Sequence, residues 1–279
     1  MAHRYLLLGT LEVNGELGAV APETPKTAAV LALLLCSANQ IVSTSAIIEE
    51  LWGSSAPKSA TTTVQTYVYL LRKFFRAQRF TDATSPLQTH PSGYVLRAAD
   101  DEMDATSFER LTRRGRQLID GGRPAEALEP LADALALWRG PALVNVPPSP
   151  TVQARVAHLD EAMMRARELQ IQANFMLGCH REMISELALL AKLHPLNEWI
   201  HEKLIEALSR AGRRADALRT FQHLRRNLAE QLGINPSPNL HRLELDVLDA
   251  RIPLQGLDAW THRRRARPAR PVPLGPSGE

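Results

Sequence analysis

Hydroxyl and basic side chains recur along the stretch KSATTTVQTYVYLLRKFFR at 58–76 with a spacing that suits binding of a polyanion. At about 100° per residue, five of them fall on one helix face: Thr62, Thr66, Tyr69, Lys73 and Arg76. That face has no carboxylate, whereas an exposed helix face ordinarily mixes acids with bases, because opposite charges one turn apart stabilise it. Hydroxyls and cations bind phosphate, and a few reach base edges in the major groove. The alternative is a solvated helix that is basic only at its end.

The opposite side of this stretch is apolar. Val64, Val68, Leu71 and Phe75 recur at spacings of three and four, which predicts a buried stripe. Basic residues gather towards the end of the stretch: Arg72, Lys73, Arg76 and Arg79. The chain of 279 residues has a net charge of only +3 and a pI of about 9.1. Attraction to nucleic acid must therefore come from such local clustering.

Residues that could support catalysis do not assemble into a known motif. His201-Glu202 begin like the zinc motif HExxH, but Ile205 stands where the second ligand would be. No GxSxG elbow or GxxxxGK[ST] phosphate loop occurs, and neither Cys36 nor Cys179 has a CxxC partner. Glu49-Glu50 are expected to face solvent or a partner. We therefore expect no enzyme activity, metal or cofactor; a groove for a small ligand between helices is a less favoured alternative.

The residues before the stretch predict a small domain of strands and helices. Short strands, with turns at Gly9-Thr10 and Asn14-Gly15, are expected at three places: Tyr5–Leu8, Leu11–Val13 and Ala19–Val20. A buried helix begins at Pro25 with Thr24 as N-cap. A second helix runs from N-cap candidates at Ser43–Ser45 to Gly53.

A hairpin is predicted after the stretch, because Leu87–Thr89 and Tyr94–Arg97 flank the turn residues Pro91-Ser92-Gly93. Helix, turn, two-faced helix and hairpin follow the order of a winged helix-turn-helix, in which the second helix enters the DNA groove. This context favours DNA binding by residues 58–76 over the solvated-helix alternative.

Only helices are predicted beyond an acidic junction at Asp101–Asp104. Gly and Pro residues mark the breaks between seven expected helices, at 105–120, 124–138, 150–177, 180–193, 197–211, 214–231 and 238–250.

An internal repeat links three of these helices. GRPAEALEPLADAL at 122–135 resembles GRRADALRTFQHLR at 212–225, and a weaker copy begins at Gly178, 34 residues before Gly212. That spacing is the tetratricopeptide period. Small and large residues are expected at matching packing positions of the copies: Ala127 and Ala217, then Leu131, Leu187 and Phe221. The region is predicted to be a stacked helical scaffold, with a generic bundle as the alternative.

Both regions resemble one family, the Streptomyces antibiotic regulatory proteins. IVSTSAIIEELWG at 41–53, TTTVQTYVYLLRK at 61–73 and HPSGYVLR at 90–97 are similar to its OmpR-like winged-helix DNA-binding domain. ALALWRGPAL at 134–143 and EQLGINPSPNL at 230–240 resemble its bacterial transcriptional activation domain. The resemblance spans roughly residues 5 to 250 and is to a small member of the family, without the nucleotide-binding module of large members.

The resemblance implies a sequence-specific transcriptional activator of a secondary-metabolite (antibiotic) gene cluster. Its expected partners are double-stranded promoter DNA with direct repeats, RNA polymerase including the sigma factor, and a second subunit bound beside the first on DNA. The expected DNA-binding residues are Thr61, Thr62, Thr63, Thr66, Tyr69, Arg72, Lys73, Arg76 and Ser92. The expected polymerase contacts lie in the loop between the two helices: Trp52, Gly53, Ser54, Ser55 and Lys58.

The stretch departs from the family pattern at a few positions. Relatives tend to have Arg or Lys near Thr61, Thr62 and Leu70, and a small hydroxyl at the position of Tyr69. This departure motivates one alternative, a helical interaction scaffold whose winged domain no longer binds DNA. A repressor that blocks polymerase has the same fold and is a further alternative.

The predicted fold is mainly α: a winged helix-turn-helix (α+β) domain at 1–99, followed by an all-α, tetratricopeptide-like activation domain at 100–252. Residues 253–279 are Arg-, Pro- and Gly-rich and are expected to be a disordered basic tail, which either adds nonspecific DNA attraction or is inert. No segment approaches the roughly twenty uninterrupted apolar residues of a membrane span, and the N-terminal apolar run is too short for a signal peptide. We expect a cytoplasmic, nucleoid-associated protein with no membrane partner and reduced cysteines.

Overall fold

The computed structural model describes residues 4–16, 18–78 and 85–252. The chain divides into two compact units, Met1–Gln170 and Ile171–Glu279, called here the N-terminal and C-terminal units. The whole of the expected basic tail at 253–279, together with Arg79, lies outside the described residues. The predicted boundary between residues 99 and 100 lies inside the N-terminal unit, and it stays a prediction.

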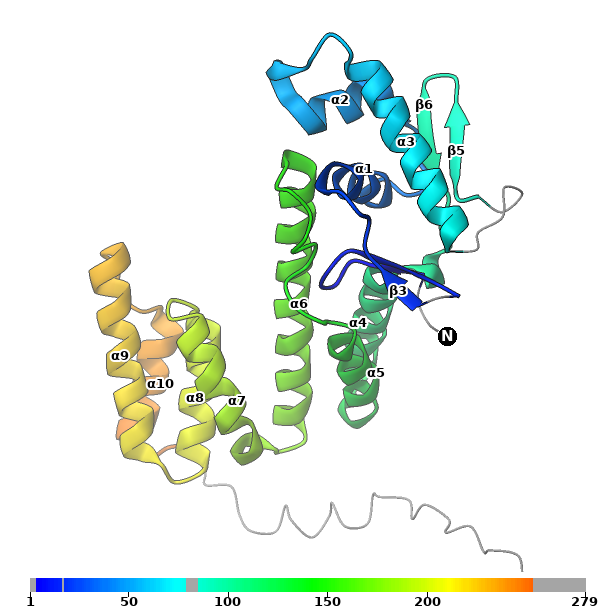
Figure 1. Cartoon of the computed structure of the whole chain (residues 1–279). Coiled ribbons are helices and arrows are strands. Elements are labelled where there is room, and N and C mark those ends of the chain that lie inside the picture. The colour runs from blue at the N-terminus through cyan, green and yellow to red at the C-terminus, as the bar shows by residue number, and fades with distance from the viewer. Residues whose placement is uncertain (1–3, 17, 79–84, 253–279) are drawn as a thin grey trace, which may run out of the picture. The chain divides into compact units, whose positions relative to one another are not determined.

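The N-terminal unit opens with an antiparallel sheet in the order β1 (Tyr5–Leu6), β2 (Glu12–Gly15), β3 (Gly18–Val20). Helix α1 (Pro25–Cys36) follows and begins as predicted. The Thr24 hydroxyl accepts a hydrogen bond from the Thr27 amide, and the Thr27 hydroxyl accepts one from the Thr24 amide. Nine of the twelve residues of α1 are buried. Figure 1 shows α1 between this sheet and the next two helices, at the centre of the core.

Helices α2 (Thr44–Trp52) and α3 (Ala60–Ala77) form the predicted helix-turn-helix, with a short 3-10 helix at Gly53–Ser55 between them. Ser43 is the N-cap of α2, since its hydroxyl accepts from the Ala46 amide at 3.1 Å.

The wing follows α3 as the hairpin of β5 (Leu87–His90) and β6 (Gly93–Leu96). A third strand, β4 (Val42–Ser43), pairs with β6 and gives the sheet the order β4-β6-β5. A Cβ at Gly93 would collide with the Val42 carbonyl, so glycine is what allows these strands to meet. The sequence did not predict β4, because two residues are too few for a periodic signal.

Helices α4 (Asp104–Asp120), α5 (Pro124–Ala136) and the greater part of α6 (Pro150–Met176) complete the N-terminal unit. α4 and α5 pack closely where Gly115 faces Leu131, as a Cβ on Gly115 would lie 2.5 Å from the Leu131 Cγ.

The acidic junction makes buried polar contacts through Asp104. Asp104 is 1% exposed, and its carboxylate accepts hydrogen bonds from the amides of Leu7 at 2.8 Å and Leu8 at 3.0 Å. Burial raises the pKa of Asp104, while those amides and the Arg139 guanidinium at 3.7 Å oppose the shift. A buried carboxylate with several donors fixes α4 to the first sheet.

Glu50 differs from its prediction, because it does not simply face solvent. Its carboxylate accepts hydrogen bonds from the Ser149 hydroxyl and from the Thr151 amide at 3.0 Å and hydroxyl at 2.7 Å. These donors lie at the first turn of α6, where amides lack partners within the helix and negative charge is favourable. Glu50 therefore connects α2 to the start of α6.

The C-terminal unit consists of the end of α6 and four further helices in the described residues: α7 (His180–Leu193), α8 (Glu198–Arg210), α9 (Arg214–Leu232) and α10 (Pro238–Leu248). The glycines that open the three repeat copies share one conformation, with φ of 71° at Gly122, 75° at Gly178 and 76° at Gly212.

The packing positions predicted from the repeat are buried. Ala127, Ala217, Leu131 and Leu187 are each 0% exposed, and Phe221 is 1% exposed. Similar turns and similar buried positions support the tetratricopeptide-like interpretation over a generic bundle.

Cys36 and Cys179 are both free thiols, and burial raises the pKa of Cys36 to about 11. His201 is buried and lies beside Asn197, to whose carbonyl its Nδ1 donates at 2.9 Å. Among residues 4–16, 18–78 and 85–252, His, Cys, Asp and Glu form no group placed to hold a metal ion. No helix of that part is long and apolar enough to cross a membrane.

Candidate nucleic-acid interface

Helix α3 has the two faces that the spacing predicts. Its buried side consists of Val64, Val68, Leu71 and Phe75, each at most 2% exposed. The other side is exposed and carries six of the predicted DNA-binding residues: Thr61, Thr62, Thr66, Tyr69, Lys73 and Arg76. The tyrosine ring stands well out of the surface, with 59% of Tyr69 exposed. The apolar stripe thus anchors the helix and leaves its polar face exposed.

Two threonine hydroxyls of α3 have their protons engaged by the helix itself. The Thr63 hydroxyl donates to the Ser59 carbonyl, and the Thr66 hydroxyl donates to the Thr62 carbonyl, each at 3.0 Å. The oxygen of each hydroxyl keeps its capacity to accept. Thr66 is therefore an oriented acceptor on the exposed face, whereas Thr63 is half-buried at its margin.

Arg72 joins α3 to the wing. Its guanidinium donates to the Leu87 carbonyl at 3.4 Å and to the Thr89 hydroxyl at 2.7 Å. Arg72 is half-buried, while the neighbouring Lys73 is exposed. The structure thus gives Arg72 a positioning contact that sequence spacing did not indicate.

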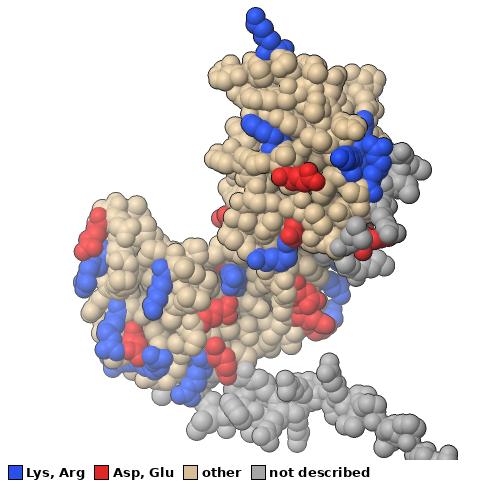
Figure 2. All heavy atoms as spheres, viewed as in Figure 1, with Lys and Arg blue, Asp and Glu red and all other residues tan. Residues whose placement is uncertain are grey.

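The tip of the wing carries Ser92 next to a histidine. The Ser92 hydroxyl and the His90 Nδ1 are 2.8 Å apart, and both residues are exposed. His90 was not among the predicted site residues; only its place at the turn of the hairpin could have indicated it. Figure 2 shows a group of Lys and Arg side chains on the right of the upper part of the molecule, where α3 and the wing lie.

The five predicted polymerase contacts lie between the last residue of α2, Trp52, and the start of α3. Trp52 is half-buried and stacks on Tyr67 with 6.4 Å between ring centroids, and the Lys26 ammonium lies 5.6 Å from its centroid. Lys26 also donates to the Leu51 carbonyl at 2.9 Å. Ser54, Ser55 and Lys58 are exposed. The packing of Trp52 therefore fixes the start of the loop, and the polar side chains that follow it are exposed.

Chemically, the α3 face offers hydroxyl acceptors, an aromatic ring and cations, and α3 itself contains no Asp or Glu. Such a surface matches the phosphates and base edges of a duplex. A family model named "Transcriptional regulatory protein, C terminal" matches residues 18–96. A second, "Bacterial transcriptional activator domain", matches residues 103–248.

Individual relatives share both regions. Regulatory protein DnrI of Streptomyces peucetius is 33% identical over 248 residues, which cover 88% of this chain and 91% of DnrI. Regulatory protein AfsR of Streptomyces coelicolor is 32% identical over 98% of this chain, and this chain spans only about a quarter of AfsR, 27%.

A solved structure agrees with the fold. The structure of Mycobacterium tuberculosis EmbR in complex with a low-affinity phosphopeptide aligns with a TM-score of 0.82 and 31% identity, and the alignment covers 94% of this chain and 68% of that chain. With both domain models matched in order and relatives such as DnrI aligned along most of its length, the chain belongs to the Streptomyces antibiotic regulatory protein family of DNA-binding transcriptional activators.

Proposed function

We propose that the protein activates transcription by binding direct repeats in promoter DNA and recruiting RNA polymerase, including its sigma factor. The observation that supports this most strongly is the exposed face of α3, which combines hydroxyls, Tyr69 and cations without a carboxylate. Its expected targets are the promoters of a secondary-metabolite gene cluster.

The α3 face suggests a division of roles. Lys73 and Arg76 are proposed to bind phosphates, and Ser92 at the wing tip is proposed to bind a flanking phosphate. Thr66 and Tyr69 are proposed to contact base edges in the major groove, with the Thr66 oxygen accepting from a base amine. Arg72 is proposed to act mainly through the wing, since its guanidinium already has partners there.

Two subunits are proposed to bind side by side on the repeats. The early part of α3 has Thr61 and Thr62 where cations would strengthen phosphate binding, so one subunit alone has few electrostatic contacts. Favourable contact between neighbouring subunits raises occupancy without any added contact to DNA.

Recruitment requires only binding free energy. A contact worth about 1.4 kcal/mol raises polymerase occupancy tenfold when occupancy is low. The loop Trp52, Gly53, Ser54, Ser55 and Lys58 is the proposed polymerase contact, because its polar residues are exposed beside the DNA-binding helix.

Gel-shift titration of the full chain against the upstream regions of neighbouring biosynthetic genes tests the DNA part. We expect binding at least a hundredfold tighter than to random duplex at physiological salt; specific DNA-binding proteins typically prefer their sites by about 10³–10⁷-fold. Equal affinity for both duplexes would overturn the proposal. Transcription in vitro with purified polymerase then separates activation, in which transcript increases, from repression, in which it falls.

A further inference from the structure

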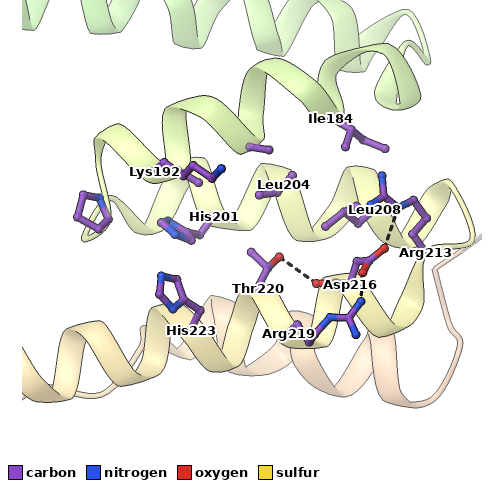
Figure 3. Close-up of a pocket in the computed structure, with 13 residues that line it drawn as sticks. Ile184, Lys192, His201, Leu204, Leu208, Arg213, Asp216, Arg219, Thr220 and His223 are labelled. Atoms are coloured by element: carbon purple, nitrogen blue, oxygen red, sulfur yellow. Dashed lines mark hydrogen bonds and ion pairs between the residues drawn. The ribbon is translucent and has the colours of Figure 1, made fainter.

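A groove of about 480 Å³ lies among α7, α8 and α9 of the C-terminal unit (Figure 3). Its floor is apolar and includes Leu204 and Leu208, which are 5% and 4% exposed, with Ile184 and Ala188 from the facing helix. The volume is within the range of about 300–1,000 Å³ that binding sites for small ligands and short segments occupy. The groove is thus large enough to hold several apolar side chains.

Charged groups line the two ends of this groove. Lys192 lies at one end with His201 and His223, and Arg213, Asp216 and Arg219 lie at the other (Figure 3). Figure 3 also shows that the side chains come from different helices and converge on one channel.

The groove is positively charged. Three permanent cations, Lys192, Arg213 and Arg219, and one carboxylate, Asp216, line it, so its formal charge is 3 − 1 = +2 with both histidines neutral. Asp216 is already neutralised, because it pairs with Arg213 at 2.8 Å and with Arg219. Lys192 has no ion-pair partner among the described residues. Positive potential is therefore left for an incoming anion.

The two ends suit an extended ligand. Asp216 and His223 are seven positions apart on α9, so they are separated by roughly 10 Å at a rise of about 1.5 Å per residue. About three residues of extended chain cover that distance. The end with Lys192 can also accept a hydrogen bond from a backbone amide, because the Nδ1 of His201 donates to Asn197 and leaves Nε2 as the acceptor of the neutral ring.

We propose that this groove binds an acidic peptide segment of a partner protein, with apolar side chains on the floor and carboxylates near Lys192 and Arg219. The positive charge of the groove favours an acidic ligand. Residues 253–279 of the same chain contain five arginines and only two acids, Asp258 and Glu279, so they carry the wrong charge to fill it. The inference does not depend on DNA binding, which the proposed function assigns to α3.

Selection from a displayed library of random twelve-residue peptides on the immobilised full chain tests the proposal. We expect the selected peptides to be rich in Asp and Glu on either side of apolar residues. Synthetic versions, followed by fluorescence anisotropy, should bind at least tenfold more weakly to Lys192→Glu and to Arg219→Glu. Arg225→Glu is the matched control: Arg225 is exposed on α9 outside the groove, and its substitution should leave affinity within twofold.

Several outcomes would overturn the proposal. Selected peptides without acidic enrichment, or equal peptide affinity of the wild type and Lys192→Glu, would exclude the groove as the binding site for an acidic peptide. An equal loss of peptide affinity in Arg225→Glu would indicate general charge attraction. If Lys192→Glu instead dissociates a dimer in sedimentation, a second copy is the occupant. Promoter affinity of each variant, measured in parallel, should stay unchanged, so failure here is distinct from failure of DNA binding.

Discussion

Lys73 and Tyr69 lie one turn apart on the exposed face of α3, yet we predict that they affect DNA binding differently. Lys73→Ala should weaken binding to every duplex and lower the salt slope by about one unit, because one phosphate contact is lost. Tyr69→Ala should change the ratio of affinities for promoter and random duplex. Titrations at several salt concentrations measure both effects. The control for the loss of one exposed lysine is Lys192→Ala, in the C-terminal unit. An unchanged preference for promoter over random duplex in Tyr69→Ala would exclude Tyr69 from base recognition.

The contact of Arg72 with the wing leads to a second prediction. Arg72→Lys keeps the charge but cannot reproduce the hydrogen bonds to the Leu87 carbonyl and the Thr89 hydroxyl. Loss of about 1 kcal/mol should speed local opening of the wing about fivefold. Hydrogen exchange of residues 85–97 measures this rate. Thr89→Val, which removes one acceptor, should show a smaller effect, and unchanged exchange in Arg72→Lys would contradict the positioning role.

His201 should make stability depend on pH. Burial lowers the pKa of His201, and the nearby His223 lowers it further. The unfolded chain, with a pKa near 6.5, therefore binds a proton before the folded chain does. Stability is fully present above about pH 6.5 and falls as the pH drops below it, by at most about 1.4 kcal/mol per pH unit for this group.

Urea unfolding at pH 7.5 and pH 5.5 measures the effect. His201→Gln cannot take up the proton, so its stability should change less between the two pH values than that of the wild type. His180→Gln should act in the same direction, since burial also lowers the pKa of His180. An identical pH dependence in His201→Gln and the wild type would contradict the assignment.

At the scale of elements, the close approach of α4 and α5 depends on one glycine. Gly115→Ala places a Cβ 2.5 Å from the Leu131 Cγ, and such overpacking costs about 1–3 kcal/mol. Leu131→Ala alone should cost about 2–5 kcal/mol through the cavity that it leaves. The double variant should be more stable than the sum of the two effects predicts, because the new methyl enters that cavity. If the losses of stability measured by thermal unfolding are additive, the methyl at position 115 and the side chain at position 131 are not in contact.

Most elements could be predicted because their signals are local. Thr24, Ser43, Gly53 and Gly233 mark helix ends by their own chemistry, and each marks an end in the structure. The strand β4 was missed because its two residues carry no periodic signal and its partner β6 lies about fifty residues later. The contacts of Glu50 and Asp104 were not predicted for a similar reason: their partners lie 99 and 97 residues away in sequence, and nothing near a carboxylate shows that a distant donor will meet it.

The N-terminal unit as a whole combines the winged helix with α4, α5 and most of α6, and polar contacts between distant segments maintain this combination. Asn145 accepts from the Leu11 amide at 2.7 Å, and Arg139 pairs with Glu12 at 2.6 Å. Glu50 and Asp104 add the contacts described above. These contacts connect the first sheet and the helix-turn-helix to the helices that follow, so the proposed DNA-binding residues belong to a body larger than the winged helix.

Asp104→Asn tests this connection most directly. An asparagine keeps one acceptor oxygen, but its NH₂ group would face the amide of Leu7 or Leu8, and one buried donor would be left without a partner. The expected cost is about 1–3 kcal/mol, measured as a shift in the urea midpoint. Exchange of the amides in residues 4–13 should rise in parallel, because the first sheet loses its anchor on α4. Asp133→Asn, an exposed carboxylate on α5, should change stability by less than about 0.5 kcal/mol. If the two variants are equally stable, the Asp104 contact does not hold the unit together, and the apolar core alone does so.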